Sequence, residues 1–203
     1  KKLVAAYPDK KTYWVQLSSV HAALGEYQNA VAVLQLAKNA GLLTEEQDQR
    51  RLAELLAHVG VPHRGGRILT AAMERDEKLR ADGGTQELLG NCWIAAREYA
   101  KAIAPLERAA ELAPSGDLYV RLAQVEVQRE DWQRATTALE RAIEKGGLSN
   151  PANAELLLGI AFYSRAKLEE ARPWFERAAS DEAYRAQAEG WLKQIEMELA
   201  TKS

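Results

Sequence analysis

Cysteine is almost absent from this chain, and so are segments that would direct it into a membrane. Cys92 is the single cysteine in 203 residues, so no internal disulfide can form and the redox compartment stays open. We expect Cys92 to be a small buried residue on a helix, where free cysteines are commonly found. No run of eighteen apolar residues occurs, so nothing is predicted to span a membrane. No charged-then-apolar segment opens the sequence either, so any secretion signal has been removed or never existed.

An excess of positive charge is also missing. Lysine and arginine together number 27 against 29 for aspartate and glutamate, which gives a formal net charge of -2. Proteins that bind nucleic acids usually carry a clustered basic excess, and no such cluster stands out along the sequence. The charge balance therefore predicts that nucleic acid is not a partner.

Residue groups that could perform catalysis are equally scarce. The histidines His21, His58 and His63 are not accompanied by a set of Cys, His or Asp that could complete a zinc site, which needs three or four converging ligands. Gly65 and Gly66 lie inside a helical pattern and lack the other residues of a phosphate-binding loop. We therefore predict no enzymatic activity, no metal and no cofactor.

What the sequence does contain is one sparse pattern in five copies. Aligned on a leucine that precedes a small residue, the copies are separated by 35, 37, 33 and 36 residues, at Leu17-Ser18, Leu52-Ala53, Leu89-Gly90, Leu122-Ala123 and Leu158-Gly159. Three further columns keep the same irregular spacings: Ala30, Gly65, Ala102, Ala135 and Ala171; Leu34, Leu69, Leu106, Leu139 and Phe175; and Ala37, Ala72, Ala109, Ala142 and Ala178. Columns that move together through insertions indicate a structural repeat.

This pattern resembles the tetratricopeptide repeat (TPR), whose signature is W-x2-L-G-x2-Y, then A-x3-F, then P, over about 34 residues. The third copy matches best, with Leu89, Gly90, Trp93, Tyr99, Ala102, Leu106, Ala109 and Pro114. The resemblance implies an all-α, right-handed α-solenoid of helix-turn-helix pairs. The small residues of each pair are expected to face one another, because only small side chains let two helices approach closely.

The repeats and their helices follow from this alignment. We expect one solenoid over 1–203, with repeats at about 11–44, 45–80, 83–115, 116–149 and 152–182 and a capping helix at about 183–199. The stretch 76–84 is charged and glycine-tipped, so it is predicted to be a surface loop. Pro105 and Pro173 fall inside predicted helices and are expected to bend them.

His21 and Glu126 occupy one further column of the repeat, in which the other three copies have Leu56, Trp93 and Phe162. His21 is expected to be packed and hydrogen-bonded between the helices. For Glu126 the alternatives are that the carboxylate extends to solvent, that it pairs with a nearby arginine or tyrosine, or that it has a functional role.

The resemblance also implies a function. In the TPR family the first helices of the pairs line a concave groove that binds a peptide or a partner protein. The corresponding positions here are Val15, Ser19, Arg50, Glu54, Glu87, Asn91, Ile94, Gln124, Val127, Gln128, Leu156, Ile160 and Tyr163. Mixed amide, charged and apolar side chains suit an extended or helical peptide. The prediction is a non-catalytic scaffold, and the alternative is an enzyme-regulatory module that binds a small ligand.

Several short segments also resemble periplasmic TPR proteins that are encoded with the TonB–ExbB–ExbD machinery. They include Tyr13-Trp14-Val15-Gln16-Leu17, Glu87-Leu88-Leu89-Gly90-Asn91 and Gly146-Gly147-Leu148-Ser149-Asn150-Pro151. The resemblance implies a bacterial accessory scaffold for TonB-dependent transport, located in the periplasm. The alternative location is the cytoplasm.

The first residues suggest a further expectation. Residues 1–8 resemble the end of a second helix, closed by Pro8 as Pro114 closes the third repeat, so they are interpreted as a remnant of a preceding repeat. Loss of that repeat would expose apolar surface and allow self-association through the N-terminal edge. The alternative is that residues 1–8 fold back as a short capping turn.

Overall fold

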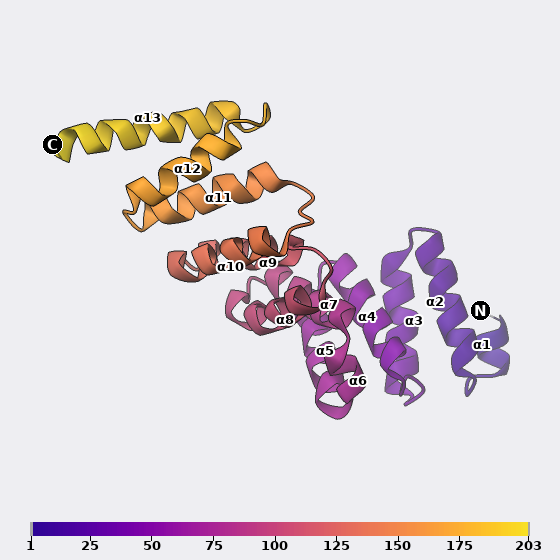
Figure 1. The fold of residues 1–203 in the computed structure, drawn as a ribbon. Coiled ribbons are helices and arrows are strands. Elements are labelled where there is room, and N and C mark those ends of the chain that lie inside the picture. Colours follow the sequence, from indigo (N-terminus) through magenta and orange to yellow (C-terminus); the bar gives the residue numbers. More distant parts are fainter. Residues whose placement is uncertain (1, 203) are drawn as a thin grey trace. The chain divides into compact units, whose positions relative to one another are not determined.

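Helix follows helix throughout the computed structural model, which describes residues 2–202. These residues form thirteen helices and no strand, in agreement with the predicted all-α class. The chain divides into two compact units, Lys1–Pro105 and Leu106–Ser203, which are described separately below. Figure 1 shows the paired helices lying side by side, as with α2 and α3 or α11 and α12.

The first unit contains α1 (Lys2–Ala6), α2 (Lys11–Ala23), α3 (Tyr27–Asn39), α4 (Glu46–His58), α5 (Pro62–Arg75), α6 (Glu77–Ala81), α7 (Gly83–Ala95) and the start of α8 (Tyr99–Leu112). The second unit contains the end of α8, then α9 (Asp117–Gln128), α10 (Trp132–Lys145), α11 (Pro151–Ser164), α12 (Leu168–Ala178) and α13 (Arg185–Lys202). Helices α8 and α12 continue across Pro105 and Pro173. The bends expected at these prolines stay predictions.

The same turn joins the two helices of all five pairs. One residue in each turn has a positive φ, namely Gly25, Gly60, Arg97, Glu130 and Ala166. The next amide donates a hydrogen bond to the carbonyl five residues back, as from Glu26 to His21 and from Lys167 to Phe162. This is the Schellman arrangement, in which glycine is favoured at the left-handed position. Three pairs form it without glycine, so helix packing dictates the turn there.

The repeated small and apolar columns form the core. Leu34, Leu69, Leu106, Leu139 and Phe175 are all fully buried, as are Ala30, Ala102, Ala135 and Ala171 in the column four residues earlier. A Cβ atom added to Gly65 would lie 2.9 Å from the carbonyl oxygen of Ala53, which shows how closely α4 and α5 approach. In the first pair the Ser18 hydroxyl donates to the Ala30 carbonyl over 3.0 Å. Small side chains are therefore required at these contacts.

The segment between α5 and α7 differs from its prediction as a surface loop. It contains the short helix α6, and Leu79 on that helix is buried. The Asp76 carboxylate caps α6 by accepting hydrogen bonds from the amides of Lys78 and Leu79 over 2.8 and 3.2 Å. Capping by aspartate and burial of one leucine stabilise a helix that the charged sequence does not suggest.

Side chains at the helix ends connect successive pairs of the second unit. The Lys145 ammonium donates to the carbonyls of Ala110 and Glu111, over 2.6 and 3.0 Å, and so caps the end of α8. The Asp117 carboxylate accepts from the amide and hydroxyl of Ser149 over 2.9 and 2.7 Å. These bonds hold the pKa of Asp117 below its usual value. The start of α9 is thereby tied to the loop before α11.

The polar residues noted in the sequence have specific partners. His21 is buried, and its Nδ1 lies 2.5 Å from a carboxylate oxygen of Glu26, as expected for a packed histidine. Glu126 is also buried and pairs with Arg129 over 2.6 Å, with Arg134 at 3.8 Å. Pairing with arginine is therefore the correct alternative for its carboxylate. Cys92 is fully buried, as predicted.

The N-terminal residues form α1, and the ring of Tyr7, just after this helix, packs near that of Tyr13 at a centroid distance of 5.8 Å. Leu3 is 53% exposed and Val20 on α2 is 55% exposed. Residue 1 lies outside the described residues. The interpretation of residues 1–8 as a remnant of a repeat, and self-association through this edge, stay predictions.

Candidate functional site

The surface between α2 and α4 contains two adjoining hollows. The first has a volume of about 370 Å³ and is lined by Ser18, Ser19, Ala22, Tyr27, Arg51, Glu54, Leu55 and His58. The second has a volume of about 500 Å³ and is lined by Lys11, Thr12, Val15, Gln16, Gln47, Asp48, Arg50, Arg51 and Glu54. Arg51 and Glu54 line both hollows, so the two form one continuous site, which we call the α2–α4 groove.

The amphipathic character of the two helices produces this groove. Leu52 and Leu56 of α4 are buried, and Val15 of α2 packs against their cluster from the groove side. Residues one position away from these leucines, Arg51 and Leu55, are turned toward the surface because successive residues of a helix differ in direction by about 100°. The groove therefore has apolar side chains at its base and polar side chains at its rim.

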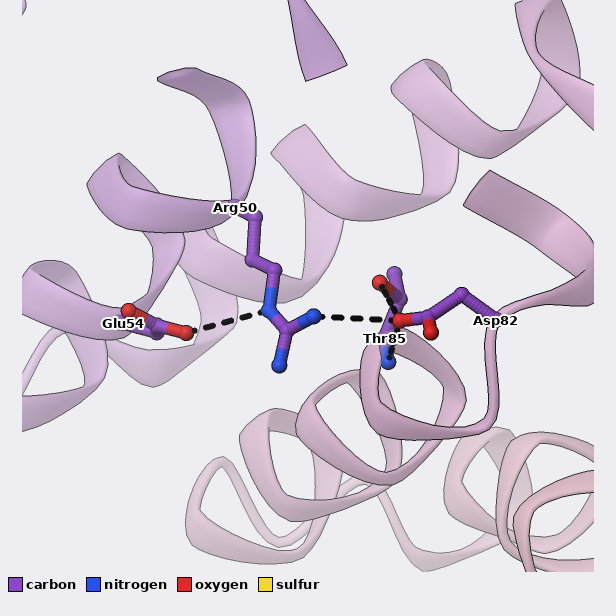
Figure 2. Close-up of polar contacts among 4 residues, drawn as sticks. All are labelled: Arg50, Glu54, Asp82 and Thr85. Atoms are coloured by element: carbon purple, nitrogen blue, oxygen red, sulfur yellow. Dashed lines mark hydrogen bonds and ion pairs between the residues drawn. The ribbon is translucent and has the colours of Figure 1, made fainter. Parts of the chain in front are cut away.

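One arginine links the groove to the next helix pair. Figure 2 shows the Arg50 guanidinium between two carboxylates. Its Nε donates to Glu54 over 3.2 Å and its Nη1 donates to Asp82 over 3.1 Å. Asp82 in turn caps α7 by accepting from the amide and hydroxyl of Thr85, both at 2.7 Å. Arg50 thus positions the start of α7, and its charge is largely neutralised.

These contacts change the acidity of Asp82. The hydrogen bond from the Thr85 hydroxyl is the main cause that lowers the pKa of Asp82, with the Thr85 amide and the Arg50 charge contributing in the same direction. A carboxyl group whose pKa is lower in the folded state than in the unfolded state adds stability above its unfolded pKa. That contribution disappears as the pH falls through the folded pKa.

We predict that Asp82→Ala lowers the free energy of unfolding by about 1 kcal/mol at pH 7, the usual effect of removing a helix N-cap. The difference from the parent protein should shrink as the pH falls below about 4, because the parent carboxylate then becomes protonated. Urea unfolding between pH 7 and pH 3 measures this. Asp9→Ala removes an exposed carboxylate whose ion pair is 3.9 Å long and serves as control. A constant difference at every pH would contradict the prediction.

The other charges in the groove are unequally compensated. Lys11 pairs with Glu45 at 2.5 Å and with Asp48 at 3.2 Å, and the Glu45 hydrogen bond is the main cause that raises the pKa of Lys11. Arg51 forms no ion pair or hydrogen bond with any residue from 2 to 202. Arg51 is therefore the one groove cation that is free to contact an anionic group.

The first hollow ends at an aromatic contact. The rings of Tyr27 and His58 lie with their centroids 3.8 Å apart, at an interplanar angle of 51°. The Ser19 hydroxyl donates to the Val15 carbonyl over 2.9 Å, so its hydrogen is engaged within α2. This end of the groove offers flat apolar surface with few free donors.

The structure brings together only some of the positions that the sequence predicted. Val15, Ser19, Arg50 and Glu54 line the α2–α4 groove. Glu87, Asn91 and Ile94 are half-buried on α7 in the same unit. In the second unit Gln124 and Gln128 of α9 are exposed, whereas Val127 of α9 and Ile160 of α11 are half-buried.

Two predicted positions on α11 do not line an open surface. Leu156 is 3% exposed and belongs to the core, so its assignment to a groove is wrong. The Tyr163 hydroxyl hydrogen-bonds to Glu198, and its ring lies 4.9 Å from that of Trp191. Both partners are on α13, so the capping helix engages Tyr163.

Sequence reasoning also missed residues that shape the groove. Lys11, Tyr27 and Arg51 line it although the family positions do not include them. Asp82 holds Arg50 from 32 positions away, and no local pattern indicates this pair. A count of unpaired charges on neighbouring first helices would have suggested Arg51.

The described part of the chain has no arrangement suited to metal chemistry or membrane crossing. Residues 2–202 contain no group of three or more His, Cys, Asp or Glu side chains placed to hold a metal ion. Within the same residues, no helix combines the length and apolar character needed to cross a membrane.

Comparison with known proteins identifies the repeats. The tetratricopeptide repeat model matches residues 12–40 and residues 120–188. No curated protein matches the chain. A crystal structure of MamA superposes with a TM-score of 0.71 at 20% identity, over 87% of this chain and 94% of that one.

Two further solved structures are similar. MamA from Desulfovibrio magneticus RS-1, residues 41 to the end, gives a TM-score of 0.65 at 16% identity, over 84% of this chain and 93% of that one. YrrB, described as a TPR protein with an unusual peptide-binding site, gives 0.61 at 23% identity, over 74% and 76%. At these identities the likeness shows the fold. The two matched segments therefore carry tetratricopeptide repeats, and the chain has the all-helical fold of these solved structures.

Proposed function

We propose that the protein is a non-catalytic scaffold whose α2–α4 groove binds a peptide segment of a partner protein. The observation that carries this proposal is the continuity of two hollows of about 370 and 500 Å³ through Arg51 and Glu54. Two connected depressions accept successive side chains of one extended or helical segment. A compact pocket with converging polar groups would instead suit a small ligand.

The chemistry of the lining fits a peptide. Gln16 and Gln47 offer amide groups that can donate to and accept from a peptide backbone. Val15 and Leu55 offer apolar surface for its side chains. Peptide recognition by helical grooves commonly combines such apolar anchors with backbone hydrogen bonds. The similarity of the fold to YrrB, a TPR protein with a peptide-binding site, supports the same function.

The unpaired side chain of Arg51 favours a peptide that carries a negative charge. Arg50 is held by Glu54 and Asp82, and Lys11 by Glu45 and Asp48, so neither cation needs a partner. Arg51 is exposed and unpaired. A peptide with an acidic residue opposite Arg51 would form a charge-assisted hydrogen bond there.

Selection from a phage-displayed library of random peptides tests this function. Peptides that are enriched on the protein should bind it in calorimetric titrations. Arg51→Ala should weaken binding, and Ser19→Tyr should abolish it by filling the first hollow. Arg67→Ala, on another surface, should bind as the parent does. The proposal fails if no peptide is enriched, or if the groove variants bind the selected peptides as well as the parent protein.

The segments that resemble periplasmic TPR proteins support a narrower proposal. We propose that the partner belongs to TonB-dependent transport and that the scaffold acts in the periplasm. Retention of TonB or ExbD from a bacterial periplasmic and membrane extract by the parent protein, and its loss with Ser19→Tyr, would support this. Equal retention by both proteins, or retention of neither component, would contradict it.

A further inference from the structure

The second helices of the first two pairs carry a cluster of positive charge. Lys38 of α3 and His63, Arg64 and Arg67 of α5 line a hollow of about 510 Å³, together with Ile68 and Ala71. We call this hollow the basic hollow. It involves none of the residues that line the α2–α4 groove. The chain as a whole has a net charge of -2, so this cluster is a local feature.

The lysine and the two arginines of the basic hollow have no carboxylate partners among the described residues, whereas the His63 ring lies 3.8 Å from a carboxylate oxygen of Glu98. The side chains of Lys38, Arg64, Arg67 and the nearby Arg75 form no ion pair or hydrogen bond with any residue that the structure describes. By contrast, Lys11, Arg50 and Arg129 elsewhere each contact a carboxylate. Burial is the main cause that lowers the pKa of Lys38, and the charges of Arg64 and Arg75 add to it. The positive charges of Lys38, Arg64 and Arg75 thus lie close together, and no ion pair within residues 2–202 neutralises them.

An apolar hollow adjoins the basic one and shares Arg67 and Ala71 with it. This second hollow has a volume of about 610 Å³ and is lined by Arg67, Thr70, Ala71, Glu74, Leu89, Trp93, Ala100, Lys101, Ala104 and Pro105. Its lining combines leucine, tryptophan, alanine and proline side chains with a charged rim. An apolar side chain placed here would contact Ala71, Ala100 and Ala104, which are the exposed apolar residues of the lining.

Neighbouring residues hold the Trp93 ring in a fixed position. A Cβ atom added to Gly66 would lie 2.9 Å from the ring, so the α5 backbone lies directly against it. The His63 ring meets it edge-on at a centroid distance of 5.6 Å, and the Lys101 ammonium lies 5.0 Å from its centroid. The apolar hollow therefore has a rigid aromatic wall next to the basic hollow.

We propose that the two hollows form one binding site for an acidic peptide segment that carries an apolar side chain. Its carboxylates would pair with Lys38, Arg64 and Arg67, and its apolar side chain would lie in the apolar hollow against Ala100 and Ala104, which are exposed. Arg67 lies between the two parts and contacts both. Unpaired arginines favour carboxylates because their planar donors match the two carboxylate oxygens.

A peptide suits this surface better than a nucleic acid does. Nucleic acids need exposed aromatic rings for stacking or a long track of cations for the backbone. Trp93 is only 5% exposed, and the cations occupy a single hollow. This inference does not depend on the α2–α4 groove, and it can hold if the proposed function of that groove fails.

Fluorescence anisotropy with a labelled peptide tests the site. The probe is a short blocked peptide with aspartate and glutamate on both sides of a central Leu-Phe pair. We expect salt-sensitive binding that Arg67→Glu weakens by about tenfold or more, because one attractive contact becomes repulsive. Ala71→Trp should also prevent binding, because Ala71 is exposed and lines both hollows.

The controls separate this site from general charge effects. Arg141→Glu makes the same change of charge at an exposed residue of α10 that lines none of the hollows described above, and it should bind the probe within about twofold of the parent. A probe with asparagine and glutamine in place of the acids, and one with serine in place of Leu-Phe, should both bind more weakly. Equal losses for Arg141→Glu and Arg67→Glu would overturn the proposal. Tighter, Arg67-dependent binding of a single-stranded oligonucleotide would also overturn it.

Discussion

Gly116→Ala is expected to lower the free energy of unfolding by about 3 kcal/mol, although it adds a single methyl group. A Cβ atom at Gly116 would lie 2.1 Å from the carbonyl oxygen of Ala142, far inside any real contact. Ala142 is fully buried on α10, so its backbone has no free space into which to move. The added methyl group must therefore displace the start of α9 from α10.

The displacement would also break a hydrogen bond. The Gly116 amide donates to the Gly146 carbonyl over 2.8 Å. This bond joins the residue that precedes α9 to the residue that follows α10. The φ of Gly116 is -77°, which any residue can adopt, so the effect arises from contact and not from backbone strain. Overpacking typically costs about 1–3 kcal/mol, and a lost buried hydrogen bond adds about 1 kcal/mol.

Urea unfolding followed by circular dichroism measures the effect. Gly190→Ala is the matched control, because Gly190 lies in α13 and a Cβ atom there would meet nothing within 4 Å. Alanine replaces glycine in a helix with a gain of about 0.5–1 kcal/mol, so this control should be slightly more stable than the parent. If Gly116→Ala were as stable as Gly190→Ala, the close approach of α9 and α10 would be wrong.

The helices and their pairing could be predicted because the repeated columns report packing directly. Leucine and small residues recur wherever two helices must approach, and the structure buries them as expected, from Leu34 to Phe175. The signal is strong because five copies carry it. A feature that occurs once, such as α6, has no such support, since one aspartate cap and one leucine in a charged segment also fit a loop.

The candidate sites were less predictable because they depend on contacts between repeats. The pair of Arg50 and Asp82 joins residues on different pairs, and neither residue is unusual in its own helix. Lys38 of α3 and Arg67 of α5 line one hollow, and only the folding of the first two helix pairs brings them together. The net charge of -2 and the 26 positions between Lys38 and Arg64 concealed this basic cluster in the sequence. The prediction that nucleic acid is not a partner stays untested.

Helix α11 shows why the position of a residue in the repeat does not by itself predict whether its side chain is exposed. Its sequence is apolar on nearly every face, so the pattern cannot distinguish the side toward the core from the side toward a ligand. Leu156 was assigned to the groove by alignment and is buried instead. Tyr163 is in contact with α13, whose exact position depends on tertiary packing.

That packing leads to the second prediction of a large effect. Phe175→Ala is expected to cost about 3–5 kcal/mol, the usual effect of truncating a buried phenylalanine. Phe175 is fully buried in α12, and its ring stacks on Trp191 of α13 at a centroid distance of 5.7 Å and an angle of 6°. The variant should therefore also loosen α13. Urea unfolding measures the stability. Because the chain has five tryptophans, the part of the fluorescence change that disappears when Trp191→Phe is added reports on α13.

A double-mutant cycle with Gly159 makes this prediction sharper. A Cβ atom at Gly159 would lie 2.7 Å from the Phe175 ring, so Gly159→Ala should destabilise the parent protein by overpacking, by about 1–3 kcal/mol. In the Phe175→Ala background the ring is gone, and the same methyl group partly fills the cavity and favours the helix. Gly159→Ala should then stabilise the protein by about 0.5–1 kcal/mol, so the coupling between the two sites should be about 1.5–4 kcal/mol. Additive effects would show that the ring does not lie against Gly159, and the assignment of Phe175 as the centre of this helix packing would have to be withdrawn.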